Sequence, residues 1–172
     1  MICYVVSETE QVESRAALTP TSAAGLVKMG LTVQAQPGLG KRSHYADEDY
    51  REVGVELVSD HAAALKGADL VLRVRKPSPD DIAGMKRGAW HVSFLDPFNE
   101  KELIAAFASA GVNGVSLEMI PRTTLAQKMD ALSSQASLAG YAAVVEAAQR
   151  IQMALPMMMT PAGTIMPSRV FV

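Results

Sequence analysis

The sequence predicts an α/β fold in which a doubly wound, mostly parallel sheet is flanked by helices. Short runs of β-forming residues alternate with helical windows as far as Leu117, which is the order that parallel sheets require. The helical windows carry their own boundary residues, such as the Thr-Pro start and glycine end around Thr21–Gly30. Apolar residues make up 49% of the chain and charged residues 20%, so the chain can bury a core.

Five or six strands are expected, joined by short helices. The expected strands are Ile2–Val6, Leu31–Ala35, Glu56–Val58, Ala68–Val74, Trp90–Leu95 and Val112–Leu117. The expected helices are Thr21–Gly30, Asp47–Glu52, Asp60–Lys66, Pro79–Lys86 and Glu100–Ala110. Rossmann-like and flavodoxin-like sheets of this kind bind ligands outside the carboxyl ends of their strands, so the loops there are the places to search.

The pattern changes after Glu118. Met129–Leu155 is one long helical window that could cross a domain, and we expect its apolar residues to be core: Leu138, Tyr141, Val144 and Val145. Pro156 ends this helix. The side chains of Met157–Met159 either fill gaps in the core, which is the preferred interpretation, or form an adaptable interface. Arg169–Val172 predicts a strand. We therefore expect the chain to have three parts: an α/β domain over 1–125, a crossover helix and linker over 126–165, and the start of a further domain over 166–172.

Charge and composition exclude several classes. The net charge of −2 and pI of about 5.9 give no basic surface for nucleic acid. No apolar run approaches the ~20 residues that a membrane helix needs, so direct membrane insertion is not expected. Cys3 is the only cysteine and is expected as a buried apolar residue.

Familiar nucleotide and metal motifs are missing from the sequence. Pro37–Ser43 has the wrong glycine spacing for a phosphate loop and is interpreted as a turn, and no G-x-G-x-x-G occurs. His44, His61 and His91 have no metal-ligand spacing, so no metal site is predicted.

Two groups of polar residues remain as candidates. Arg15 and Arg75 follow expected strands and could clamp a carboxylate or phosphate of a substrate, although solvated surface charge is the simpler reading. The loop before the long helix holds Arg122, Gln127, Asp130 and Ser133. These side chains either cap that helix or hold a polar ligand in a fixed orientation.

The segment MIPRTTLAQKMDALSSQASLAGYAAVVEAA (Met119–Ala148) resembles the α subunit of proton-translocating NAD(P) transhydrogenases. Further segments agree with that family in the same order: Glu13–Pro20, Leu72–Pro77, Val92–Leu103 and Met157–Val172. The resemblance implies that Arg122, Gln127 and Asp130 are the family's Arg-Gln-Asp loop beside bound NAD(H). It also implies that Leu132 and Ser133 contact NAD. In the family a glycine-rich NAD domain follows, so 166–172 would be its truncated start.

The resemblance also implies an activity and partners. Hydride would pass between NADH on this subunit and NADP(H) on a partner subunit, coupled to proton translocation by membrane subunits. Gln127 would position the two cofactors, while Arg122 and Asp130 would fix the loop and the carboxamide. A homodimer is expected, cytoplasmic and peripheral to the inner membrane through its partners. The chain alone is expected to be inactive and to bind NAD weakly or not at all.

Two alternatives stay open. Alanine dehydrogenase belongs to the same fold family, but Asp96 stands where that enzyme has its catalytic histidine, and Arg75 where it has a substrate-binding lysine. The chain could also be a non-catalytic module without its NAD domain. Leu125 replaces a second arginine of the transhydrogenase loop, which puts nucleotide affinity in question.

Overall fold

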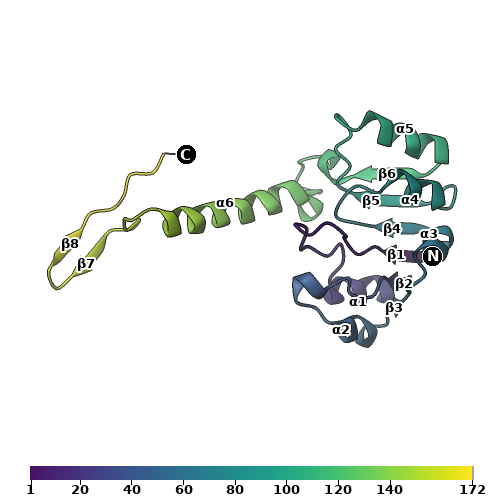
Figure 1. Ribbon diagram of the computed structural model, residues 1–172, viewed down its shortest axis with the longest axis horizontal. Coiled ribbons are helices and arrows are strands. Elements are labelled where there is room, and N and C mark those ends of the chain that lie inside the picture. Colours follow the sequence, from purple (N-terminus) through teal and green to yellow (C-terminus); the bar gives the residue numbers. More distant parts are fainter. Residues whose placement is uncertain (172) are drawn as a thin grey trace. The chain divides into compact units, whose positions relative to one another are not determined.

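The computed structural model describes residues 1–171, which form two compact units divided after Pro121. The first unit is the α/β domain and the second holds the long helix (Figure 1). The boundaries predicted at residues 125 and 165 stay predictions, as does the assignment of 166–172 to a further domain. No helix in the described residues is both long enough and apolar enough to cross a membrane.

Six parallel strands form the sheet of the first unit, in the order β3-β2-β1-β4-β5-β6. Their bounds are β1 Ile2–Val5, β2 Thr32–Ala35, β3 Glu56–Leu57, β4 Leu70–Leu72, β5 Trp90–Ser93 and β6 Asn113–Ser116. This order, with β1 and β4 side by side at the centre, is that of Rossmann-type folds. The predicted doubly wound sheet is therefore confirmed.

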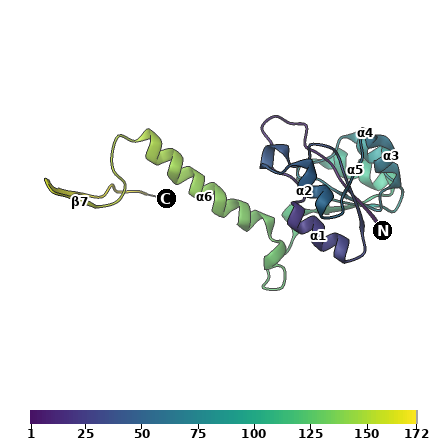
Figure 2. The same cartoon turned by 90° about the horizontal axis from the view of Figure 1, so that it is seen from below.

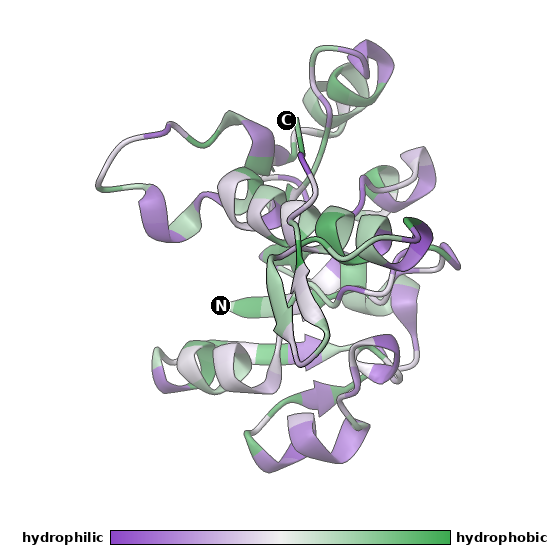
Figure 3. Cartoon of the chain, turned by 90° about the vertical axis from the view of Figure 1, so that its left-hand side faces the viewer, coloured by the Kyte–Doolittle hydropathy of each residue, from purple (hydrophilic) through white to green (hydrophobic). Residues whose placement is uncertain are grey.

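Five α-helices connect these strands: α1 Pro20–Lys28, α2 Asp47–Glu52, α3 His61–Gly67, α4 Pro79–Gly84 and α5 Lys101–Ala110. Local residues fix where they begin. The Thr19 side chain caps α1, and Ser78 and Asp81 form a reciprocal capping box on α4. Proline opens both helices, where its missing N–H costs nothing. Figure 3 shows α2 largely in the hydrophilic colour, as its sequence DEDYRE requires.

The sheet has an apolar core on each face because side chains alternate along a strand. On β1, Cys3 and Val5 pack with α1 and α2, whereas Tyr4 packs on the opposite face with α3, α4 and α5. Helices α1 and α2 therefore cover one face of the sheet and α3, α4 and α5 the other; Figure 2 labels these five helices. Cys3 is buried as expected, and burial raises the pKa of its thiol to about 11.

The second unit contains the long helix α6, Ala131–Arg150, which confirms the predicted helix in a shorter form. Its apolar residues are not core within this chain: Leu138, Tyr141, Val144 and Val145 are all at least half exposed. That expectation was wrong, because no other element of the second unit covers these side chains.

An antiparallel hairpin follows α6, formed by β7 (Met158–Thr160) and β8 (Gly163–Ile165). Met157–Met159 is exposed, so its preferred reading as core filler was also wrong. The strand predicted at Arg169–Val172 is absent over residues 169–171, where no strand of the described chain lies alongside to pair with it, and Val172 lies outside the described residues.

Candidate functional site

The loop before α6 forms a polar pocket of about 290 Å³ within the second unit. It brings together four of the predicted site residues, Arg122, Gln127, Asp130 and Ser133, and adds the hydroxyls of Thr123 and Thr124. A 3-10 turn, Gln127–Met129, leads directly into α6 and joins Gln127 to Asp130. Leu132, predicted to contact a cofactor, is half-buried on the first turn of α6 and does not line this pocket.

Asp130 is the N-cap of α6. Its Oδ1 accepts the backbone N–H of Ser133 at 3.0 Å and its Oδ2 accepts the Ser133 hydroxyl at 2.6 Å. These hydrogen bonds from Ser133 hold the pKa of the Asp130 carboxyl below its usual range, and the charge of Arg122 adds to the effect. The carboxylate thus stays ionised, and its oxygens already serve the helix terminus.

Gln127 and Arg122 differ from Asp130 because both side chains are exposed. Their amide and guanidinium groups can therefore reach a ligand without first leaving the protein interior. Leu125, in the same loop, is 93% exposed, so this large apolar side chain has no place in the fold of the chain itself.

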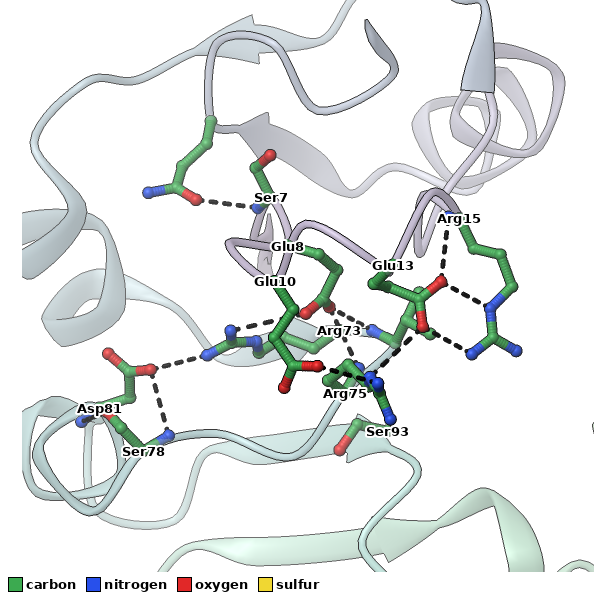
Figure 4. Close-up of polar contacts among 12 residues, drawn as sticks. Ser7, Glu8, Glu10, Glu13, Arg15, Arg73, Arg75, Ser78, Asp81 and Ser93 are labelled. Carbon is green, nitrogen blue, oxygen red and sulfur yellow. Dashed lines mark hydrogen bonds and ion pairs between the residues drawn. The ribbon is translucent and has the colours of Figure 1, made fainter. Parts of the chain in front are cut away.

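A second polar cluster lies at the switch point of the sheet, where β1 and β4 are adjacent (Figure 4). Glu8 follows β1, and its Oε1 accepts the backbone N–H of Val74 at 2.8 Å and of Arg75 at 3.1 Å. Its Oε2 lies 3.7 Å from Nη2 of Arg73, and both side chains are at least nine-tenths buried. Glu8 therefore joins the loop after β1 to the loop after β4.

Arg73 continues the network towards α4. Its Nη1 donates to Oδ2 of Asp81 at 2.7 Å, and Oδ1 of Asp81 accepts from Nε2 of His61 at 2.9 Å. Burial raises the pKa of Asp81, but the hydrogen bond from His61 and the charge of Arg73 outweigh it, so the pKa lies below the usual range. The sequence gives no sign of this contact of His61, because Asp81 lies 20 residues further along the chain.

Arg15 and Arg75, the predicted anion-binding residues, are both paired with acids. Nε and Nη2 of Arg15 donate to Glu13 at 2.8 and 2.7 Å, and Nη2 of Arg75 donates to Glu10 at 2.8 Å. The hydrogen bond from Arg15 holds the pKa of Glu13 below its usual range. A ligand anion at either arginine would have to compete with a carboxylate that the chain already supplies.

Asp96 follows β5 with a left-handed backbone, φ 50°. Its two carboxylate oxygens accept the side-chain amide of Asn99 at 2.9 and 3.1 Å, which ties the acid into its own turn. Glu118, which follows β6, also holds this turn, because its carboxylate accepts hydrogen bonds from the backbone N–H groups of Leu95 and Asp96. The carboxylate of Asp96 is therefore a structural group of the loop.

Sequence reasoning missed Glu8, Asp81 and His61 as members of a network. One signal could have found Glu8: its acid side chain follows the first strand, and the carboxyl ends of adjacent parallel strands meet at one edge. That edge is also where Arg73 and Arg75 lie.

The two polar clusters and the strand order can be compared with known proteins. Residues 4–139 match the model of the family described as "Alanine dehydrogenase/PNT, N-terminal domain". The chain belongs to this family. The match covers the sheet from Tyr4 onwards, the Arg122–Ser133 loop and the start of α6.

The relatives of this family member include the NAD(P) transhydrogenase subunit alpha of Cereibacter sphaeroides, 38% identical over 93% of the chain and 31% of that protein. A crystal structure of transhydrogenase from Sinorhizobium meliloti superposes with a TM-score of 0.89 and 41% identity, over 97% of the chain and 50% of the other. The resemblance stated from the sequence is thus confirmed.

Alanine dehydrogenases are more distant relatives of the chain. That of Staphylococcus saprophyticus is 29% identical over 70% of the chain and 32% of its own length. A solved L-alanine dehydrogenase has a TM-score of 0.65 and 26% identity, over 70% of the chain and 33% of its own. The chain spans between a third and half of the length of these proteins, so they carry parts that the chain does not match.

Proposed function

We propose that this chain is the N-terminal part of the NAD(H)-binding subunit of a proton-translocating NAD(P) transhydrogenase. The complete enzyme would transfer hydride between NADH on this subunit and NADP(H) on a partner subunit. The observation that carries the proposal is the pocket formed by Arg122, Gln127, Asp130 and Ser133, in a chain whose nearer relatives bear the transhydrogenase name.

The donor set of this pocket fits the nicotinamide end of a dinucleotide better than its phosphates. Helix N-termini attract phosphate through free N–H groups, but Asp130 places a carboxylate on the first turn of α6. The exposed Gln127 amide can both donate to and accept from a carboxamide. No glycine-rich phosphate loop occurs in the sequence, so the pyrophosphate would bind to another part of the enzyme.

The roles that follow are orienting roles. The nicotinamide, when bound, supplies the hydride, and the task of the protein is to hold the reacting rings in contact and exclude water. Gln127 would fix the orientation of the ring through its carboxamide. Arg122 and Asp130 would hold the loop in place, and Ser133, already oriented by Asp130, would donate or accept at the cofactor. Leu132 would add an apolar contact.

Arg15 and Arg75 are proposed only as a secondary anion or substrate site, because acids of the chain pair with both. Partners would include the NADP-binding and membrane subunits, and the enzyme would lie on the cytoplasmic side of the inner membrane. A homodimer is supported by the exposed apolar side chains of α6 and the hairpin, including Tyr141 and Met159.

The competing activity is oxidation of alanine. Asp96 disfavours it, because a carboxylate tied to Asn99 is no substitute for a histidine that exchanges protons with substrate. The deciding experiment supplies the complete enzyme with NADH plus an NADP analogue, and separately with NAD plus L-alanine. The proposal expects nucleotide-to-nucleotide transfer and no alanine-dependent NADH formation. The reverse result would overturn it.

A further inference from the structure

The side chain of His61 lies at the centre of a series of hydrogen bonds in the α/β domain. Its Nδ1 lies 2.9 Å from the Tyr4 hydroxyl and 3.3 Å from Nε2 of Gln36. Its Nε2 lies 2.9 Å from Oδ1 of Asp81. Oε1 of Gln36 accepts the backbone N–H of Ser7 at 2.8 Å (Figure 4). The series therefore runs from α4 through α3 to the loop that follows β1.

The backbone N–H of Ser7 decides which form of His61 these contacts require. A backbone N–H can only donate, so the oxygen of Gln36 must face Ser7 and its NH2 group must face Nδ1 of His61. That NH2 group also only donates, so Nδ1 must carry a lone pair and the ring proton must be on Nε2. This tautomer suits Asp81, whose carboxylate accepts from Nε2. The arrangement is that of a neutral histidine.

The surroundings of His61 also accept a protonated ring. Asp81 on α4 and Asp60, the N-cap of α3, favour a positive charge, whereas Arg73 after β4 opposes it. Tyr4 on β1 can accept a hydrogen bond as well as donate one. The imidazole is 33% exposed and lines a cavity of about 500 Å³, whose other charged groups are Glu8, Glu10, Arg75 and Lys76. The ring can therefore take up a proton from solvent and keep its bond to Asp81.

We propose that protonation of His61 breaks the hydrogen bond between Ser7 and Gln36, so that the attachment of the loop after β1 depends on pH. The added proton occupies Nδ1, which then donates to the Tyr4 hydroxyl and no longer accepts from Gln36. The Gln36 amide turns its oxygen to His61 or withdraws, and in both cases the Ser7 N–H loses its acceptor. The proposal does not depend on the transhydrogenase function.

The backbone around this contact stays in place when the side chain moves. The backbone N–H of Gln36 donates to the carbonyl of Val5 at 3.1 Å, and that of Val6 donates to the carbonyl of Leu72 at 3.1 Å. Ser7 comes next, and its N–H donates to a side chain. Ser7 also lines both cavities at this edge of the sheet, of about 170 and 500 Å³. Its release changes the wall that the two cavities share.

Nuclear magnetic resonance can follow the Ser7 amide and the His61 ring in the same sample. Histidine changes its charge between about pH 5 and 8, so hydrogen exchange is measured across that range. As pH falls and His61 takes up its proton, the protection factor of the Ser7 amide should drop about fivefold or more, the loss of one hydrogen bond. The Val6 amide is the internal reference, because its acceptor is the Leu72 carbonyl. A constant Ser7 protection factor through the His61 titration would overturn the proposal.

Two substitutions separate this response from a general effect of pH. His61→Asn keeps an acceptor for Gln36 but cannot take up a proton, so the Ser7 amide should stay protected. His44→Asn is the matched control at an exposed histidine and should keep the full response. Gln36→Glu supplies a carboxylate that accepts from both Ser7 and a protonated His61, so it should also abolish the loss. The unchanged pH response in His61→Asn or Gln36→Glu would count against the role of His61.

Discussion

The Asp130 carboxylate accepts two hydrogen bonds from Ser133, one from its backbone N–H and one from its hydroxyl. A single pair of residues thereby starts α6 and orients a hydroxyl at the pocket. Capping and ligand binding, which were alternatives in the sequence, are compatible in the structure because the oxygens of Asp130 serve the helix while Gln127 and Arg122 remain exposed.

The role of Asp130 as the N-cap of α6 can be tested by measuring helix content. Asp130→Ala should lower the far-UV circular dichroism of α6, whereas Asp130→Asn should retain most of it, because asparagine is also a good N-cap. Since the pKa of Asp130 is lowered in the folded chain, the charged cap is present above the unfolded pKa and is lost as pH falls through the lowered value. Equal losses in the two variants would contradict the cap.

A buried histidine gives the α/β domain a pH-dependent stability. His91 is fully buried on β5, its Nε2 lies 3.0 Å from the Ser93 hydroxyl, and burial lowers its pKa from 6.5 to about 4. The unfolded chain therefore binds more protons between these values, so stability falls as pH drops from 6.5 to about 4. The contribution lost is about 3 kcal/mol by the usual conversion.

Urea unfolding across this pH range measures that contribution. His91→Phe keeps a ring beside Phe107 but cannot titrate, so its free energy of unfolding should vary less with pH than that of the unchanged chain. His44→Asn is the matched control, because His44 is exposed and asparagine tolerates its left-handed backbone, φ 62°. The same pH slope in His91→Phe and His44→Asn would contradict the assignment.

The exposed apolar face of α6 predicts self-association. Tyr141→Asp places a charge among Leu138, Val144 and Val145, and should weaken dimerisation at least about tenfold, or about 1.4 kcal/mol. Gln149→Asp adds the same charge at an exposed polar position of the helix and serves as control. Light scattering over a range of concentrations gives both constants, and an unchanged dimer in Tyr141→Asp would argue against this face.

The 172-residue polypeptide should bind NADH weakly or not at all. Its pocket offers partners for a carboxamide, but the sequence contains no glycine-rich loop for the pyrophosphate, which supplies much of the affinity of a dinucleotide site. Calorimetry with NADH should therefore give little or no heat of binding. Micromolar or tighter binding would show that these residues hold the dinucleotide by themselves.

Much of the fold could be predicted from local patterns. The bounds of α2, Asp47–Glu52, match the prediction because acids open the helix and Gly54 follows its end. The strands are predicted one to four residues too long, since hydrophobic runs such as Ala68–Val74 are longer than the part that is in register with the neighbouring strands, here Leu70–Leu72. The β7–β8 hairpin escaped prediction because each strand has only three residues and the Pro161–Ala162 turn lacks the usual hairpin glycine pair.

The candidate sites differ in how far the sequence could predict them. Arg122, Gln127, Asp130 and Ser133 lie within twelve residues of one another, so a local motif sufficed to group them. Glu8 lies 66 residues from Val74, and only the adjacency of β1 and β4 brings them together. Arg15 and Glu13 are close in the sequence, but a sequence does not show whether a carboxylate of the same chain already neutralises an arginine.

The central claim is that Gln127 orients the nicotinamide for hydride transfer. The most direct measurement compares Gln127→Asn with the unchanged subunit in the complete complex, for NADH affinity and for the rate of hydride transfer in a single turnover. Asparagine keeps the amide and withdraws it by one methylene, so the account predicts a rate at least about tenfold lower with NADH affinity nearly unchanged. An unchanged rate of hydride transfer would contradict it.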